Sequence, residues 1–420
     1  MPFKLRILNA ANRTMQRAGF LKLLCAAAAR SDTSSLQTLG NHLIETVTKR
    51  IRVEPPFSDA LKTYANLRLT DRIYADLRKN ILSQTPEPAA LEIQDLYLAD
   101  PRLPSCVGKL VQKDWRFYPY LATSLDFIKP GTYSAMTRAL VLLAVTAKEE
   151  LAAFDQFAPD HNPFLLTREQ AAVVFFCCAD NDAAVVHPLF SQLAGLDRPQ
   201  FDEREAGELL PAILRAAIAE AQRQVLAPED RDRVAKLSSV AASIERWKGR
   251  RFTGGGPREE AIRPRLEPYC DLGLFTKPEP HRFFYQCTPA LRALLAHWRG
   301  PADTDDFLAN RFFTALAAMH GLTPQPAAPD EARAAFLAAA EFIKSSLGYS
   351  PITDLGLLAG LRLLFGQNRL LEIKQADALL LAWQKEAPDA VRFTVDRMGN
   401  RAYVKFLKPT PNTANAIPAK

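Results

Sequence analysis

Apolar residues recur every three or four positions over long stretches of this chain, which is the spacing of one face of an α-helix. Thr167 stands where a helix N-cap belongs, ahead of a strongly apolar stretch. Asp180, Asp182 and the His187–Pro188 step predict that this helix ends before residue 188. The sequence therefore predicts a mainly α fold. The clearest stripes are Leu210, Ile213, Leu214, Ala217 and Ala221, then Phe336, Ala340, Ile343 and Leu347.

Two segments in the C-terminal half replace the helical spacing with short runs typical of strands. Aromatic residues lie on both sides of a proline-containing loop within 274–287, which predicts a short hairpin. Residues 391–406 alternate between apolar and polar side chains on both sides of Gly399 and Asn400, a pair suited to a tight turn. A second hairpin is therefore expected there.

The length of the chain predicts several packed units, because single hydrophobic cores stop growing at roughly 250 to 300 residues. Prolines, glycines and polar runs suggest where the units divide, and the run from Gly300 to Asp306 resembles a linker. The predicted organisation is a helical N-terminal region (1–100), a helical domain (101–236), a helix-and-hairpin unit (237–299), a linker with one helix (300–349), a second helix-and-hairpin unit (350–408) and a disordered tail (409–420).

Residues 258–298 follow the order helix, DLGLF, hairpin, TPALRALL. This order resembles the second half of a winged helix-turn-helix domain, in which a recognition helix enters the major groove and a hairpin wing approaches the DNA backbone. The resemblance implies which basic residues would contact DNA. They are Arg258, Arg263 and Arg265 on the recognition helix, with Lys277 and Arg282 on the wing.

Residues 350–408 have a similar predicted order of elements, two helical stripes followed by a hairpin. The short helix that the family usually has between those two helices has no obvious counterpart here. By the same resemblance this hairpin is a wing, and its charge is one-sided, as phosphate neutralisation requires. A solvated edge hairpin protected by its charges is the alternative. The basic residues are Arg392, Arg397, Arg401, Lys405 and Lys408, against Asp396 as the only acid.

Composition changes this picture little. Lysine and arginine outnumber aspartate and glutamate by 53 to 46, a net charge of +7 that permits an anionic partner without requiring one. Six scattered cysteines with no CxxC pair indicate reduced thiols and a cytoplasmic protein. We find no apolar run that approaches the roughly 20 residues needed to span a bilayer, so no membrane partner is expected.

The sequence lacks the common signatures of catalytic and metal sites. The Gly254–Gly256 cluster has no trailing lysine and serine or threonine for a nucleotide phosphate, and there is no GxSxG or HExxH motif. Cys270, His281, Cys287 and His297 match no standard zinc spacing. Catalysis is therefore not favoured, and no metal or cofactor is expected. An enzyme built from residues on distant helices is a weaker alternative.

These observations favour a non-catalytic DNA-binding protein. The Ala- and Arg-rich composition is compatible with a bacterial source, and the role we expect is a regulator or the DNA-engaging subunit of a bacterial DNA-processing or anti-phage defence assembly. The alternative is a protein-binding helical scaffold or adaptor subunit that uses winged helices for protein contacts, since a fold does not fix a function. A basic stripe across both units would favour DNA, and a large exposed apolar patch would favour protein. The oligomeric state stays open.

Overall fold

The computed structural model describes residues 4–8, 18, 21–22, 25, 122, 124–127, 137–147, 166–224, 228–246, 262–278, 284–345, 347–395 and 401–407. This part of the chain is mainly helical and contains three small sheets, as the sequence pattern predicts. The predicted tail (409–420) and most of the predicted N-terminal region (1–100) lie outside the described residues.

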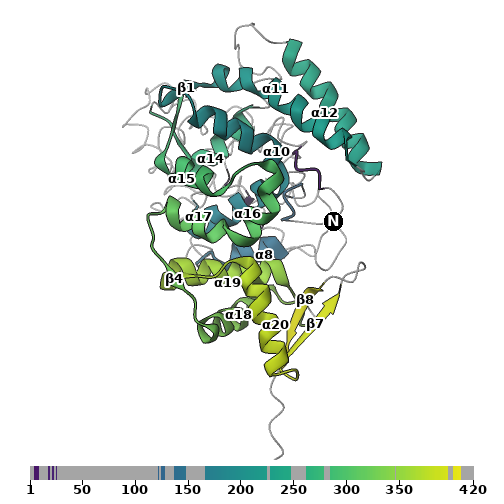
Figure 1. Ribbon diagram of the computed structural model, residues 1–420, viewed down its shortest axis with the longest axis vertical. Coiled ribbons are helices and arrows are strands. Elements are labelled where there is room, and N and C mark those ends of the chain that lie inside the picture. The colour runs from purple at the N-terminus through teal and green to yellow at the C-terminus, as the bar shows by residue number, and fades with distance from the viewer. Residues whose placement is uncertain are drawn as a thin grey trace, which may run out of the picture.

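The long helix α10 (Arg168–Ala194) runs through the middle of the molecule (Figure 1). The hydroxyl of Thr167 accepts the N–H of Gln170, whose side chain in turn accepts the N–H of Thr167, which confirms the predicted N-cap. Of its 27 residues, 19 are buried. A helix that is apolar on every side must be surrounded by other elements, and α10 is.

The helix does not end before Pro188 as predicted. It changes direction at Asp182, whose backbone is not helical (φ −131°, ψ 15°), and then continues through His187 and Pro188 to Ala194. A proline within a helix removes one backbone hydrogen bond, and the break at Asp182 lies six residues before it. The predicted end of the helix is therefore a kink.

Helix α10 also corrects the expectation about membrane-spanning length. It is the one helix among the described residues that is long and apolar enough to cross a bilayer by length and composition alone. However, 89% of its most apolar window is buried inside the protein. The length of α10 is therefore accounted for by its place in the core.

A first unit surrounds the C-terminal half of α10. Its three-stranded antiparallel sheet has the order β1-β3-β2, with Phe201 opposite Tyr285 and Phe275 opposite Cys287. The sequence predicts β2 and β3 but not β1, which lies in a region expected to be all helical. The elements are β1 (Gln200–Asp202), α11 (Glu203–Gln222), α12 (Pro228–Arg246), the 3-10 helix η3 (Arg263–Arg265), α14 (Glu267–Asp271), β2 (Phe275–Thr276), β3 (Phe284–Cys287) and α15 (Pro289–His297).

The predicted linker at residues 300–306 is helical instead. It forms η4 (Pro301–Asp303) and the start of α16 (Thr304–Asn310), which is followed by α17 (Phe312–Met319). Trp298 is fully buried just before it, and its indole N–H donates to the Thr304 hydroxyl over 3.2 Å. Acidic residues in the first turn favour a helix start, so a run that reads as a polar linker is the beginning of a helix.

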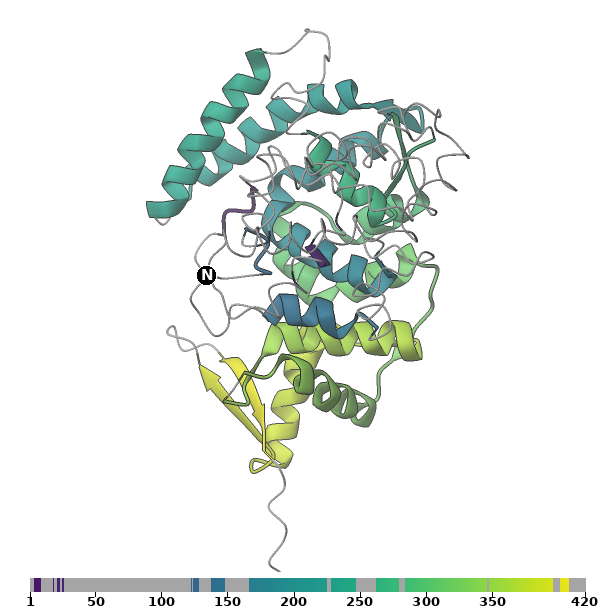
Figure 2. The same ribbon diagram turned by 180° about the vertical axis from the view of Figure 1, so that it is seen from behind.

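A second unit follows at the other end of the molecule, away from α11 and α12 (Figures 1 and 2). Its antiparallel sheet has the order β5-β8-β7, and the predicted C-terminal hairpin is confirmed. The first helix of this unit, α18, lies inside the segment (300–349) that was predicted as a linker with one helix. The elements are β4 (Gln325–Pro326), α18 (Pro329–Ile343), β5 (Ser350–Pro351), α19 (Ile352–Gln367), β6 (Arg369–Leu370), α20 (Ile373–Glu386), β7 (Val391–Val395) and β8 (Arg401–Phe406); β4 and β6 pair in parallel.

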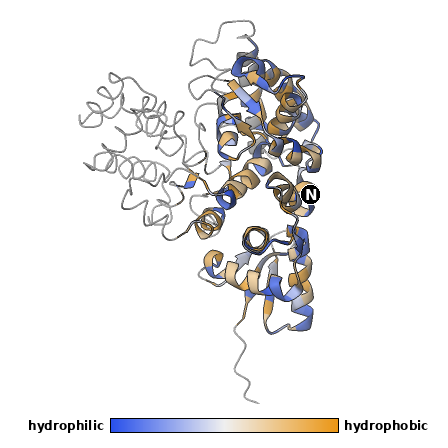
Figure 3. Cartoon of the chain, turned by 90° about the vertical axis from the view of Figure 1, so that its left-hand side faces the viewer, coloured by the Kyte–Doolittle hydropathy of each residue, from blue (hydrophilic) through white to orange (hydrophobic). Residues whose placement is uncertain are grey.

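Both units share one topology, although the sequence shows no repeat. In each, a helix leads into a short strand, a second helix follows directly, and the last strand of the unit lies in the middle of the sheet. Their buried side chains form one continuous hydrophobic cluster, which also includes α8 (Thr137–Ala144). Figure 3 shows apolar residues along the helices at both ends of the molecule.

The two units are joined where α17 meets the second unit. The carboxylate of Glu372 accepts the backbone N–H groups of Phe313 and Thr314 over 3.1 and 2.8 Å, so a residue of the second unit caps α17. Gly360 in α19 faces the ring of Phe313, and a Cβ at that position would lie 2.3 Å from the nearest ring carbon. Glycine is therefore required for this close approach.

We predict that Gly360→Ala destabilises the protein by about 1 to 3 kcal/mol, because the added methyl group overpacks the contact with Phe313. Gly366→Ala is the matched control in the same helix, since a Cβ at that position meets nothing within 4 Å. It should be neutral or stabilising by up to about 1 kcal/mol, because alanine favours helix more than glycine does. Chemical denaturation of both variants tests this, and equal stabilities would contradict it.

Candidate nucleic-acid interface

The hairpin of β7 and β8 places two cations directly opposite each other. Arg392 is the register partner of Lys405. The side chains of the two flanking pairs point to the opposite face of the hairpin; these pairs are Val391 with Phe406 and Phe393 with Val404. Val391 and Val404 are fully buried, so that face packs on the core and the face of Arg392 turns outward. Like charges directly opposite each other on a sheet repel.

Neither cation has a carboxylate partner within 4.0 Å among the described residues. Arg392 is exposed. Lys405 lies over the ring of Tyr349, with its ammonium 5.3 Å from the ring centroid, and its side chain also passes close to Gly348. A cation on an aromatic face is weakly stabilised, but its charge is not neutralised. The pair therefore forms a site of uncompensated positive charge.

Arg401, the next basic residue predicted to contact nucleic acid, faces a different direction. The register of the hairpin shifts at Val395, whose partner is Arg401, and this bulge turns Arg401 toward α20. Its guanidinium donates to Asp377 over 3.0 Å and lies over the ring of Phe393. The side chain is 37% exposed, so the pair remains open to solvent. Arg397 lies outside the described residues.

Helix α20 presents a surface beside this hairpin. Its buried face consists of Ile373, Ala376 and Leu380. Its exposed face has two lysines near its ends and small side chains between them, and its exposed acid, Glu386, is paired with Arg333 of α18. Such a face allows a close approach of another surface. The exposed residues are Lys374, Gln375, Ala378, Ala382, Lys385 and Glu386.

Of the residues predicted for the first unit, the two whose side chains the structure describes, Arg265 and Lys277, are largely buried. Arg265 is 2% exposed and belongs to the core. Lys277 donates to Glu267 over 2.7 Å, with only 8% of its side chain exposed. Arg263 begins η3, but its side chain is not among those described, and Arg258 and Arg282 lie outside the described residues. No basic stripe that includes Arg265 can therefore connect the two units.

Arg265 instead forms the central buried ion pair of the first unit. Its guanidinium donates to both carboxylate oxygens of Asp182, over 2.8 and 3.2 Å. Asp182 also accepts the backbone N–H of Leu8, and Arg265 donates to the Leu8 carbonyl. The pair therefore holds the kink of α10, η3 and the N-terminal segment 4–8 together.

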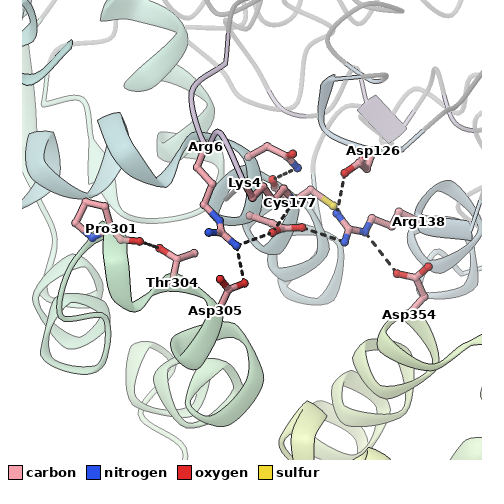
Figure 4. A network of polar contacts seen from close by, with 11 residues as sticks. Lys4, Arg6, Asp126, Arg138, Cys177, Pro301, Thr304, Asp305 and Asp354 are labelled. Atoms are coloured by element: carbon pink, nitrogen blue, oxygen red, sulfur yellow. Dashed lines mark hydrogen bonds and ion pairs between the residues drawn. The ribbon is translucent and has the colours of Figure 1, made fainter. Parts of the chain in front are cut away.

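A second cluster of charges surrounds Asp180, two residues before Asp182 on α10. Figure 4 shows Lys4, Arg6 and Arg138 of this cluster. Lys4 contacts its carboxylate over 2.8 Å, and Arg138 of α8 contacts it over 3.1 Å. Arg138 also reaches Asp354 of α19 over 3.5 Å. Arg6 donates to Asp305 of α16 over 2.6 Å. The cluster therefore connects α8, α10, α16, α19 and the N-terminal segment.

The environment of Asp180 favours its charged form. Burial raises the pKa of this carboxyl, but the charges of Lys4 and Arg138 outweigh burial, so the pKa lies below its ordinary value. A sequence signal for this cluster exists: Asp180, Asn181 and Asp182 interrupt an otherwise apolar stretch. Polar residues inside an apolar helix must find buried partners.

Burial keeps two groups of types common in catalysis in their uncharged forms. Burial raises the pKa of Cys177 to about 12, so its thiol stays protonated and is a poor nucleophile. Burial also lowers the pKa of His187, whose Nε2 contacts the carbonyl of Trp298 over 2.8 Å. Within the described ranges, no group of three or more His, Cys, Asp or Glu residues is arranged to hold a metal ion.

We predict that Arg265→Met destabilises the protein by about 3 to 5 kcal/mol, because it leaves the Asp182 carboxylate buried without its cation. The control is Arg215→Met, which removes an exposed arginine paired with Glu245 and should cost less than about 1 kcal/mol. Urea denaturation of the three proteins measures the difference. Similar losses in both variants would show that the buried pair is not important for stability.

We also predict that the stabilising effect of Asp180 disappears in acid. Because its pKa is lowered in the folded protein, its contribution is complete above the ordinary carboxyl value and is lost as the pH falls below about 4. The difference in unfolding free energy between the natural protein and Asp180→Asn should therefore be constant near neutral pH and shrink below about pH 4. A difference that does not change with pH would contradict the assigned charge contacts.

Comparisons with protein-family models, with curated proteins and with solved structures found no match to this chain. The interface is therefore interpreted from its own geometry and charge. Within the described residues, Arg392 and Lys405 are the predicted interface residues that the structure brings together. The exposed face of α20 adjoins them, although the sequence did not predict it as part of the interface.

Proposed function

We propose that this chain binds DNA through its second unit, residues 329–407, with the β7–β8 hairpin on the phosphate backbone. The observation that carries the proposal is the outward-facing pair of Arg392 and Lys405, two cations held opposite each other with no carboxylate beside them among the residues that the structure describes. Two adjacent phosphates of the DNA backbone, each with one negative charge, would neutralise the pair and remove its repulsion. Phosphate contacts of this kind supply most of the sequence-independent affinity of DNA-binding proteins.

The order of elements supports the same proposal. The unit consists of three helices, α18, α19 and α20, followed by a hairpin, as the winged helix-turn-helix resemblance implies. In that arrangement α20 is the helix closest in sequence to the wing, and its lysines and small exposed side chains suit a groove.

The wider role that we propose is that of a regulator or the DNA-engaging subunit of a bacterial DNA-processing or anti-phage defence assembly in the cytoplasm. In this role the protein acts without a cofactor and without chemistry of its own. The first unit then serves as a support, because its predicted recognition residue Arg265 stabilises the core.

A specific observation favours the alternative of a protein-binding scaffold. Leu337, Phe342 and Leu347 are 45%, 48% and 72% exposed on α18 and the loop after it. Large apolar side chains exposed within one short segment are typical of surfaces that contact protein. The two functions are compatible, since in Figures 1 and 2 the hairpin and α18 lie on opposite sides of the second unit.

We predict salt-dependent binding of the protein to random-sequence duplex DNA, measured by fluorescence anisotropy over a salt series. In the double variant Arg392→Ala, Lys405→Ala, the slope of the logarithm of affinity against the logarithm of salt should fall by about two, because each phosphate contact contributes about 0.9 to the slope.

The control for this measurement is the double variant Arg215→Ala, Lys236→Ala, which removes the same charge from exposed positions on α11 and α12 at the far end of the molecule. It should leave the slope unchanged. Absence of binding at low salt would overturn the proposal, and an equal loss in both double variants would show that net charge, not the hairpin, causes the binding.

A further inference from the structure

The outward face of α20 has a lysine near each end and only apolar side chains between them. Lys374 and Lys385 are exposed and lie eleven residues apart, which is close to three turns, so both are on the same line along the helix. Between them Ala378 and Ala382 are exposed and Leu381 is partly buried. Apolar side chains neither donate nor accept hydrogen bonds. The middle of this face therefore meets a bound surface with methyl groups alone.

The glutamine at the edge of this face is engaged within the protein. Gln375 Oε1 accepts the backbone N–H of Glu372 over 3.0 Å, as part of the capping box of α20. A glutamine that reads adenine makes a bidentate pair, with both its amide oxygen and its amide nitrogen on the base. The oxygen of Gln375 is directed instead at the N-cap residue of its own helix. Gln375 therefore makes such a pair only if the cap is lost.

The two acids of α20 are held in ion pairs. Asp377 accepts from Arg401 of the hairpin over 3.0 Å. Glu386 accepts from Arg333 of α18. A carboxylate that reads cytosine must accept from the amino group of the base, and both of these carboxylates already accept from a guanidinium. Gln384 lies two turns after Asp377, on the same side of the helix, and is partly buried. The acids and amides of α20 therefore lie off its outward face or are bound within the protein.

We propose that α20 contacts duplex DNA of any base sequence, with Lys374 and Lys385 on phosphates; the proposal rests on the function proposed above. The two lysines are about 16 Å apart along the helix, given a rise of about 1.5 Å per residue. Because the major groove is about 12 Å wide, one lysine can lie at each of its phosphate walls. Neither ammonium group has a carboxylate within 4.0 Å among the described residues, so both charges are available to phosphates.

Contacts of this kind narrow the wider role. Phosphate contacts fix the orientation of a protein on the duplex but carry no sequence information. A regulator must select its site among many competing ones, which requires a large difference in affinity between sequences. A subunit that holds DNA for a larger assembly has no such requirement. The face of α20 therefore favours the DNA-engaging subunit over the regulator.

Selection from a random-sequence duplex library by the full chain, followed by sequencing, tests the proposal. We expect no enriched motif, whereas one bidentate base contact would change affinity by about fivefold to 150-fold. The selection is repeated with Arg397→Ala, because Arg397, a predicted contact residue, lies outside the described residues. A motif that Arg397→Ala still enriches overturns the proposal and leaves DNA binding in place. Absence of binding to every duplex overturns the proposed function as well.

The role of the two lysines has its own test, by fluorescence anisotropy on duplexes of equal composition and permuted base order. Lys374→Ala, Lys385→Ala should reduce the salt slope by about two, because each phosphate contact contributes about 0.9. The affinity should fall by the same factor on every duplex. Lysine can also pair with guanine, and loss of such a pair would weaken some duplexes more than others. An unchanged slope, or unequal losses among the duplexes, overturns the proposal.

A change at Gln375 separates the capping role of this residue from base reading. Gln375→Glu keeps the oxygen that closes the capping box and removes the amide donor that adenine requires. The added negative charge should lower affinity on all duplexes alike, so their order of preference should not change. The control is Arg215→Ala, Lys236→Ala on α11 and α12, which should leave both affinity and slope unchanged. A changed order of preference in Gln375→Glu contradicts the proposal.

Discussion

The break in α10 at Asp182 is the constraint on which the rest of the structure depends. Two charged residues, Asp180 and Asp182, lie two positions apart on the most buried helix and each need partners, because an ionised carboxylate without them is very costly to bury. Asp182 takes Arg265 from the first unit, and Asp180 takes Arg138 from α8. Arg138 in turn contacts Asp354 of the second unit. A single turn of helix thus determines how both units are arranged around α10.

The two units have the same topology but differ in what their charges do. In the first unit, the helical segment before the hairpin is buried, and the pairs Arg265 with Asp182 and Lys277 with Glu267 hold it in the core. In the second unit, the corresponding helix α20 has an exposed face, and the hairpin that follows exposes Arg392 to solvent. Basic residues near the hairpin are therefore buried in ion pairs in the first unit, whereas Arg392 is exposed in the second, and the sequence alone does not distinguish the two environments.

This difference explains which features could be predicted from the sequence and which could not. Local signals gave correct predictions: the Thr167 cap, the stripe of α11 and the alternation in residues 391–406 depend on neighbours in the chain. Predictions that needed distant partners were wrong. Arg265 reads as a surface cation because Asp182, its partner, is 83 residues away. The run at residues 300–306 reads as a linker because the buried Trp298 that anchors it cannot be recognised from composition.

The N-terminal segment 4–8 has a consequence for how the chain reaches its folded state. Arg6 contacts Asp305, 299 residues later, and the backbone of Leu8 contacts Arg265. Pairings so distant in sequence give a high contact order, which slows folding. During synthesis the first residues emerge long before their partners exist. The N-terminal segment can therefore make its contact with Asp305 only after residue 305 has been translated.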